Sequence, residues 1–367
     1  MKESDFYSLD RIDSYHALYN IIISGRSNGK SYAVYRKAIK NYLETGKQAA
    51  LIRRYSDDFT GKRGQSMFEN LVKTGEVSKL SGGRWTDVTY WSSRWYLCCY
   101  DPDTGDRIRD TEPFCYGFSI SAMEHDKSTG FPDITTIMFD EFIARTFYLD
   151  DEFVLFMNVL STIIRHRTDV TIYMMGNLVN KYCPYFAEMG LTHVKKMEPG
   201  TIDIYHYGES KLTVAVEFAE NKVAKKSKAD VYFAFNNPKL QMITGEQWEI
   251  GIYPHCPQRY TQADVIFTYF IIFNGDTVQC EIVFVDDTTF TFCHKKTGEI
   301  KYPKTDTIFT PAFNHQLNYH RNIAKPTTAL GHRIFRYYRE DKVFYSDNET
   351  GEIVRNYLLW CGYKKGA

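Results

Sequence analysis

The chain contains 367 residues, 43% of them hydrophobic and 16% aromatic, which supplies enough apolar material for the cores of two domains. Its 45 Lys and Arg side chains balance its 45 Asp and Glu side chains, so the charge argues against a surface given over entirely to nucleic acid and allows only local basic patches. No stretch approaches the ~20 apolar residues of a membrane helix, the N-terminus has no apolar signal core, and the eight cysteines form no C-x-x-C pair; we expect a soluble, cytoplasmic protein with reduced thiols and no membrane partner.

An apolar strand within residues 18–31 runs into a glycine-bearing loop that ends in Gly29, Lys30 and Ser31. Backbone N–H groups of such a loop converge on nucleotide phosphates, the lysine adds a positive charge, and the serine hydroxyl can hold Mg²⁺. The pattern G-x-x-x-x-G-K-[ST] is met imperfectly, because a serine occupies the first glycine position. Taken alone, the Gly-Lys-Ser triplet is also a common helix start. The predicted nucleotide-binding residues of the loop are Ser24, Gly25, Arg26, Ser27, Asn28, Gly29, Lys30 and Ser31.

Apolar residues at helical spacing predict a helix over 33–43 that stops at Gly46, with its positive N-terminal end beneath the phosphates. The next strand, 48–55, carries Arg53 and Arg54 at its exit. Both arginines are candidates for nucleotide or interface contacts. An aromatic-rich stretch over 85–100 predicts a hairpin, with residues 101–105 as its turn.

A short β-rich run over 134–139 ends in Asp140 and Glu141. In a P-loop ATPase the aspartate steadies Mg²⁺ and the next carboxylate polarises the attacking water. In isolation the two acids could instead solvate a strand end and begin a turn. With both motifs in the expected order, we predict hydrolysis of ATP with Mg²⁺, with Ser31 and Asp140 at the metal and Glu141 at the water.

The first ~200 residues alternate strand-like and helix-like segments, as an α/β sheet requires. A helix over 153–164 precedes Arg165, and a strand over 169–177 ends in Gly176 and Asn177. We predict a P-loop domain over 1–198, a basic linker over 199–230, and a second α/β domain over 231–367. The second domain contains an antiparallel meander, with strands over 265–273, 278–285, 288–293 and 307–310.

The order of these motifs resembles the DNA-packaging ATPases of phi29-like short-tailed phages, most densely over residues 6–186. The matching segments are Phe6-Tyr7, the loop 24–31, Arg53-Arg54-Tyr55, Phe139-Asp140-Glu141-Phe142, Arg165-x-Arg167, Gly176-Asn177 and Pro184-Tyr185-Phe186. The resemblance implies an additional-strand (RecA/ASCE-like) P-loop ATPase domain with a mainly parallel sheet. It also implies a smaller C-terminal RNase H-like domain, a vestigial nuclease that binds nucleic acid or portal.

The resemblance further implies a ring motor, a homopentamer in the host cytoplasm docked on the portal of the prohead, which drives double-stranded DNA inward. A packaging RNA lies between ring and capsid in that family. By position, Arg165 matches the arginine finger inserted into a neighbour's site, and Lys127 matches a lysine that also acts across the interface. Two plainer roles stay open: Arg165 as a cation at a helix C-terminus, and Lys127 as a solvated loop residue.

A packaging motor must hold DNA by its backbone, because it cannot depend on sequence. Lys62 and Arg63, in a glycine-flanked basic loop over 61–64, are the best local candidates, although any exposed loop can carry two basic residues. Gly176 and Asn177 would sense the γ-phosphate and relay its loss toward DNA; the alternative is a tight turn.

Two other functions remain as alternatives. A large terminase would carry an active C-terminal endonuclease, whose two Mg²⁺ ions need several converging carboxylates. Here the first strand has only Asp264 before it and no acid within it, while Asp286 and Asp287 end the next strand, so that site looks degraded. A virion component that binds ATP without hydrolysis is the second alternative, and Glu141 argues against it.

Overall fold

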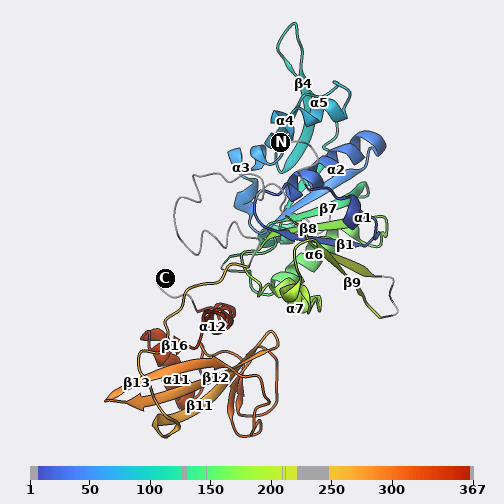
Figure 1. Cartoon of the computed structure of the whole chain (residues 1–367). Helices are drawn as coiled ribbons and strands as arrows, with labels where there is room; N and C mark the ends of the chain where they lie inside the picture. The colour runs from blue at the N-terminus through green and yellow to red at the C-terminus, as the bar shows by residue number, and fades with distance from the viewer. Residues whose placement is uncertain are drawn as a thin grey trace. The chain divides into compact units, whose positions relative to one another are not determined.

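A ten-stranded mixed sheet forms the centre of the first part of the chain (Figure 1). The structure is a computed structural model that describes residues 7–125, 130–145, 147–208, 210, 212–220 and 248–363. It divides into two compact units, Met1–Trp248 and Glu249–Ala367. None of the helices in the described ranges is long and apolar enough to cross a membrane.

The first unit contains the following elements, in two groups. The strands are β1 (Tyr19–Ser24), β2 (Gln48–Arg53), β3 (Asp87–Trp91), β4 (Arg94–Tyr100), β5 (Arg107–Arg109), β6 (Cys115–Ser119), β7 (Ile134–Asp140), β8 (Thr171–Asn177), β9 (Thr201–His206) and β10 (Thr213–Phe218). The helices are α1 (Asp10–Asp13), α2 (Lys30–Thr45), α3 (Gly61–Ser66), α4 (Glu69–Lys73), α5 (Glu76–Leu80), α6 (Glu152–Ile164) and α7 (Pro184–Glu188), with short 3₁₀ helices η2 (Ser56–Phe59), η3 (Ile120–His125) and η4 (Val194–Lys196).

The central strands run parallel in the order β6-β2-β7-β8-β1-β10. β8 lies between β1, which enters the phosphate loop, and β7, which ends in Asp140. A strand inserted between these two is the defining feature of an additional-strand P-loop sheet, so the predicted α/β fold is confirmed. Ser24 pairs with Asn177, and Asp140 pairs with Met175. The carboxyl ends of β1, β7 and β8 therefore meet at one edge of the sheet, where ligands bind in this architecture.

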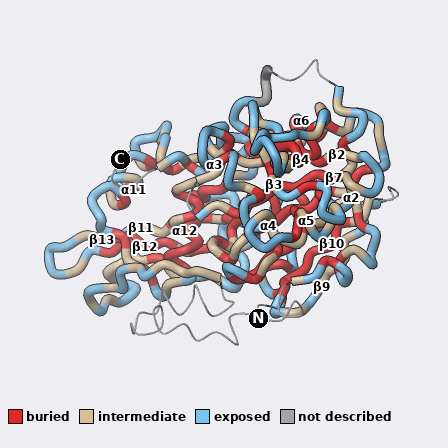
Figure 2. The backbone as a smooth tube through the Cα atoms, turned by 90° about the horizontal axis from the view of Figure 1, so that it is seen from above, coloured by how far each residue is buried: buried red, intermediate tan, exposed pale blue. Residues whose placement is uncertain are grey.

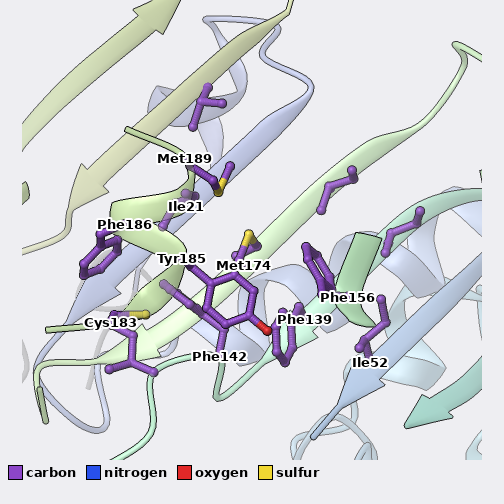
Figure 3. Close-up of a cluster of buried hydrophobic side chains, with 14 of the residues drawn as sticks. Ile21, Ile52, Phe139, Phe142, Phe156, Met174, Cys183, Tyr185, Phe186 and Met189 are labelled. Atoms are coloured by element: carbon purple, nitrogen blue, oxygen red, sulfur yellow. The ribbon is translucent and has the colours of Figure 1, made fainter. Parts of the chain in front are cut away.

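Buried side chains alternate between the two faces of this sheet, as the period of a strand requires. Ile21 packs on the face covered by α6 and α7, whereas Ile22 packs on the face covered by α2. Figure 2 shows the buried positions concentrated in the interior elements. On the α6 face, the rings of Phe139 and Phe142 lie 5.5 and 5.8 Å from the ring of Tyr185 (Figure 3). This cluster lies directly beneath the turn that follows Asp140.

The boundary predicted after residue 198 is wrong. β9 and β10 form an antiparallel pair, and β10 pairs in parallel with β1 from Tyr19 to Ile23. β9 and β10 are therefore part of the ten-stranded sheet, and the first unit continues to Trp248. The remainder of the predicted linker, from residue 221, lies outside the described residues.

Two local predictions also differ from the structure. β3 and β4 form the predicted hairpin, but its turn is Ser92-Ser93, and residues 101–105 connect β4 to β5 instead. The predicted basic loop over 61–64 is helical, because it begins α3. Tertiary packing explains the glycine at residue 64: a Cβ atom there would lie 2.6 Å from the Tyr90 ring, so only glycine allows so close an approach.

The second unit is a six-stranded sheet with the order β15-β14-β11-β12-β13-β16. The predicted antiparallel meander forms from β11, β12 and β13, with two parallel strands added beside β11. Its elements are η5 (Gln262–Asp264), β11 (Val265–Phe273), β12 (Asp276–Val285), β13 (Thr288–Lys295), β14 (Thr307–Phe309), β15 (Tyr319–His320), α11 (Ala329–Arg339), β16 (Val343–Tyr345) and α12 (Asn348–Trp360).

Candidate phosphate-binding site

The phosphate loop joins the end of β1 to the start of α2. Ser24, which replaces the first glycine of the motif, is fully buried, and its φ is not positive. Since Ser24 still belongs to the regular strand, that position does not need glycine. Gly29 does need it, because its φ of 92° lies in the left-handed region immediately before the helix. The departure from the motif therefore leaves the helix start beneath the loop intact.

Lys30 is held by oxygen atoms from two neighbouring strands. Its ammonium donates to Asn177 Oδ1 at 2.6 Å and to Ser24 Oγ at 3.2 Å. Burial lowers the pKa of Lys30 to about 8, although the carboxylates of Asp140 and Glu141 oppose this effect by raising the pKa. A buried ammonium with few water contacts gains from an anionic ligand, so the lysine is suited to bind phosphate.

Asp140 accepts hydrogen bonds from three side chains at this edge. Its Oδ1 accepts from Ser31 Oγ at 3.0 Å, and its Oδ2 accepts from Tyr35 at 2.6 Å and from Arg53 at 2.8 Å. Burial and the Asp140 carboxylate raise the pKa of Tyr35, so its phenol is a neutral donor. Tyr35 was not predicted, although it lies four residues after Ser31 on the same helix face.

Arg53 contacts both acids of the predicted site. In addition to Asp140, its Nη1 lies 2.8 Å from Glu141 Oε2. Burial disfavours the charge of this guanidinium, but Asp140, Tyr35 and Glu141 raise its pKa, so it stays charged. Arg53 is not among the described residues that line the pocket below, and its predicted contact with nucleotide stays a prediction.

A pocket of about 420 Å³ opens over the loop, and this volume suits a small ligand. Its lining includes the loop residues from Arg26 to Ser31 together with Tyr32, Asn70, Asp140, Glu141, Met175 and Asn177. Tyr32 and Asn70 were missed, because nothing in the local sequence at 70 marks it as close to the loop. Within the described ranges, Asn28 Nδ2 is buried without a hydrogen-bond partner, which leaves one donor available to an anion.

The residues present fit a hard divalent cation. Ser31 Oγ and Asp140 Oδ1 converge within 3.0 Å, and both are oxygen donors of the kind that Mg²⁺ prefers. Ser31 and Asp140 would hold the ion, as predicted. When bound with nucleotide, Mg²⁺ would neutralise charge on the phosphate oxygens.

Gly176 and Asn177 connect the two halves of the site. Asn177 contacts Lys30, as described above, while a Cβ atom at Gly176 would lie 2.6 Å from Ile143 and 2.8 Å from Phe142. The tight-turn alternative does not apply, because both residues end β8. The pair therefore touches the phosphate loop on one side and the turn after Asp140 on the other.

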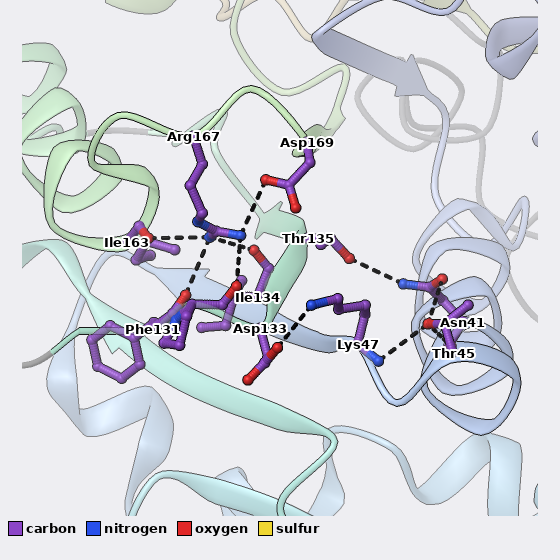
Figure 4. Close-up of polar contacts among 11 residues, drawn as sticks. Asn41, Thr45, Lys47, Phe131, Asp133, Ile134, Thr135, Ile163, Arg167 and Asp169 are labelled. Atoms are coloured by element: carbon purple, nitrogen blue, oxygen red, sulfur yellow. Dashed lines mark hydrogen bonds and ion pairs between the residues drawn. The ribbon is translucent and has the colours of Figure 1, made fainter.

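Arg165 lies at the amino ends of the parallel strands, at the opposite edge of the sheet from the pocket. It follows α6, which begins beside the turn after Asp140 and ends where Arg167 donates to the carbonyls of Phe131, Ile134 and Ile163 (Figure 4). The carbonyls of Phe131 and Ile134 lie at the start of β7, and a seven-residue strand is ~20 Å long. Exposed Arg165 therefore cannot reach the pocket of its own chain, which is the geometry that a residue acting on a neighbour needs.

Of the other predicted residues, Lys62 and Arg63 lie together on α3 and border a cavity of about 640 Å³. Lys127 lies outside the described residues. The structure thus brings together the loop, Asp140, Glu141, Gly176 and Asn177, and it places Arg165 and the α3 pair elsewhere.

The family described as podovirus DNA encapsidation protein (Gp16) matches residues 1–81 and 110–288. These residues make up more than half of the chain and include every described residue of the pocket. The chain belongs to this family.

Curated relatives include DNA packaging proteins of Bacillus phages. The protein of phage B103 is 27% identical over 183 residues, which are 48% of this chain and 50% of the relative. That of phage phi29 is 26% identical over 195 residues, 52% of each chain. The chain thus spans about half the length of the curated relatives it matches.

Solved structures match over nearly the whole length. The Phi-28 gp11 DNA packaging motor aligns with a TM-score of 0.53 at 16% identity, covering 99% of this chain and 100% of that one. A chain of the bacteriophage phi29 genome packaging motor assembly aligns with a TM-score of 0.53 at 18% identity, covering 96% of each. At these identities the likeness shows a shared fold.

Proposed function

We propose that this chain is an ATP-driven motor subunit that moves double-stranded DNA through a portal into a phage prohead. The observation that carries the proposal is the convergence of Lys30, Ser31 and Asp140 around one pocket at the carboxyl edge of the sheet. Family membership supports the same activity. The site would act in the host cytoplasm, at the portal vertex, as the resemblance to phi29-like motors implies.

The chemistry follows from the roles that these side chains can take. Lys30, the loop N–H groups and the N-terminus of α2 would hold the phosphates. Glu141, exposed at the pocket, would orient the attacking water and accept its proton. Arg53 would have to leave at least one carboxylate when Mg²⁺ binds to Asp140, because the cation and the guanidinium compete for the same acid.

Arg165 is proposed as the finger that completes a neighbour's site. Its place at the far edge of the sheet, beyond the reach of its own pocket, supports action between subunits. An arginine that stabilises charge on the γ-phosphate oxygens is worth about 10³ to 10⁵ in rate. A homopentameric ring would then let each subunit control hydrolysis in the next. Lys127 is proposed, by resemblance alone, to act across the same interface.

For the second unit we propose binding of DNA, packaging RNA or portal without nuclease activity. A meander extended beside its first strand by two parallel strands is the arrangement of an RNase H-like core, and this supports that assignment. In the described part of the chain no group of three or more His, Cys, Asp or Glu side chains could hold a metal. Lys62 and Arg63 on α3 are proposed as contacts to the DNA backbone.

An E141Q variant tests the proposal. It should bind Mg²⁺ and ATP as the wild type does, while turnover falls about 10² to 10⁴-fold, the usual worth of a general base. Hydrolysis and nucleotide binding are measured separately, with DNA and proheads present. An E141Q variant with full turnover would remove Glu141 from the mechanism. A wild type that binds ATP but never hydrolyses it would favour the non-hydrolysing virion component.

A further inference from the structure

A buried ion pair, Arg54–Glu152, lies beside the site without lining its pocket. The side chains are 8% and 2% exposed. Nε of Arg54 donates to Oε2 of Glu152 at 2.7 Å, and Nη2 donates to Oε1 at 2.9 Å. The hydroxyl of Tyr185 and the backbone N–H of Leu149 also donate to Glu152, at 2.9 and 2.8 Å. The ring of Tyr148 lies 5.0 Å from the guanidinium. Every charged group of this pair is therefore engaged.

Stability alone is a poor explanation for this pair. Removing two charges from water costs free energy, and an apolar pair of similar volume is often as stable or more stable. What a bidentate pair supplies, and an apolar pair does not, is a fixed direction for the remaining N–H groups of the arginine. The question is what those groups hold.

The remaining N–H groups of Arg54 hold the backbone of the turn after Asp140. Nη2 of Arg54 donates to the carbonyl of Phe142 at 2.7 Å, and Nη1 donates to the carbonyl of Glu141 at 3.3 Å. Glu141 has a φ of 60°. A residue other than glycine keeps this left-handed conformation only where its surroundings impose it. The two bonds from Arg54 hold the carbonyl of that residue and the carbonyl of the next.

Arg53 and Arg54 hold the turn from two sides. Arg53 is the last residue of β2, and Arg54 follows it directly. Arg53 pairs with the side-chain carboxylates of Asp140 and Glu141, each at 2.8 Å, whereas Arg54 binds only backbone carbonyls there. Arg53 can release the carboxylates when ligands arrive, and Arg54 can keep the backbone in place while it does so.

We infer that the Arg54–Glu152 pair positions the Glu141 carboxylate for its action on the attacking water. This inference rests on the proposed ATPase function. Arg54 is a positioning residue, because it does not line the pocket and contacts the lining residue Glu141 only at its backbone carbonyl. Glu152 is the first residue of α6, so the pair anchors the turn to a 13-residue helix.

The test replaces both charges at once. R54M alone would leave Glu152 buried and unpaired, so the informative variant is R54M/E152M, which removes the carbonyl bonds without an orphaned charge. Its unfolding midpoint should stay near that of the wild type, and its affinity for Mg²⁺ with a non-hydrolysable ATP analogue should change less than about twofold. Its kcat should fall on the order of 100-fold, the usual effect of misplacing a catalytic group by about 1 Å.

Two further variants keep the test decisive. R36M/E76M removes another Arg–Glu pair, in which Arg36 Nε lies 2.6 Å from Glu76 Oε1, and should leave kcat unchanged. R54K keeps the positive charge but loses the planar guanidinium that donates to Glu152 and to the carbonyls at the same time. Its kcat should therefore fall while nucleotide binding is retained, and this test holds even if the double variant does not fold.

A stable double variant with kcat within about twofold of the wild type would overturn the inference. So would a loss of kcat that only follows the unfolded fraction. If the wild type itself hydrolyses no ATP, the proposed function fails, and a crystal structure of R54M/E152M then decides the inference. Departure of Glu141 from its positive φ would support it, and an unchanged turn would overturn it.

Discussion

Lys30 and Asp140 each contact partners that a nucleotide complex would have to rearrange. The lysine is bound to Asn177, and the aspartate is bound to Arg53 as well as to Ser31. Phosphates and a cation would replace the Asn177 and Arg53 contacts with stronger ones. Because Gly176 packs against Phe142, such a change at Asn177 is next to the turn that carries Glu141. This proximity is the physical basis for the proposed relay.

Gly176 is predicted to be indispensable for that packing. In G176A the new methyl group would lie 2.6 Å from Ile143, so side chains after Asp140 must shift. We expect a loss of about 1 to 3 kcal/mol in the free energy of unfolding, together with lower turnover, both measured on the purified chain. Gly130 serves as control, because a methyl group added there would meet nothing within 4 Å, and G130A should change neither quantity. Equal effects in both variants would refute the packing argument.

The Glu281–His294 pair makes a pH-dependent contribution to the free energy of unfolding of the second unit. The hydrogen bond from His294 lowers the pKa of Glu281 to about 2, and the same bond raises the pKa of His294. The stability gained from the Glu281 carboxylate is present above its ordinary pKa of 4.5 and is lost as the pH falls toward 2. The stability gained from protonated His294 is present below its ordinary pKa of 6.5 and is lost as the pH rises through the raised pKa. Both act fully only between these two ordinary values.

An NMR titration of His294 checks this account. The wild-type imidazole should titrate above its ordinary pKa of 6.5, and E281Q should move that pKa down. Tyr260 and Gln279 also donate to Glu281, so Y260F serves as a control that keeps the carboxylate. A pKa of His294 that is the same in wild type and E281Q would contradict the pairing.

The residues of the phosphate loop and the two acids could be predicted because their chemistry dictates the residue types in a short stretch. Tyr35 could have been found from its helical spacing to Ser31. Arg54 and Glu152 could not be paired, since they lie 98 residues apart and meet only through the fold. Asn70 reaches the pocket in the same way, through the packing of α4 rather than through a local pattern.

At the scale of elements, strong hydrophobic patterns correctly predicted the central strands and helix, whereas weak patterns gave wrong predictions at the margins of the sheet. β1, α2 and β7 were predicted because an apolar run or a helical stripe extends over the whole element. β10 was missed, although its residues are buried at five of six positions, because the surrounding polar composition indicated a linker. The glycines at 61 and 64 likewise predicted a loop, but these residues begin α3, where Gly64 packs closely against Tyr90.

The place of β10 predicts where the chain can be cut. A fragment ending at residue 198 lacks β10, which pairs with β1. The backbone of β1 is then exposed along one side, so the fragment should aggregate or remain unfolded. A fragment ending at residue 248 keeps the whole sheet and should unfold cooperatively, as followed by circular dichroism and denaturant titration. A stable, monomeric 1–198 fragment would show that the hairpin is dispensable.

At the scale of the whole molecule, the pocket and Arg165 lie at opposite edges of one sheet. Such a subunit presents an incomplete site on one side and the missing charge on the other, which suits a closed ring of identical copies. The interface is then heterologous, because each copy gives Arg165 to one neighbour and receives it from the other. ATP hydrolysis would thereby depend on the arrangement of two subunits, and this is the central claim of the motor proposal.

ATP turnover in mixed rings tests that claim most directly. R165A and K30A should each lose turnover by about 10³-fold or more when assayed alone at ring-forming concentration. An equal mixture should recover up to about a quarter of the wild-type rate, because a site with Lys30 can receive Arg165 from a K30A neighbour. Full activity of R165A alone, or no recovery in the mixture despite ring formation, would contradict hydrolysis shared between neighbouring subunits.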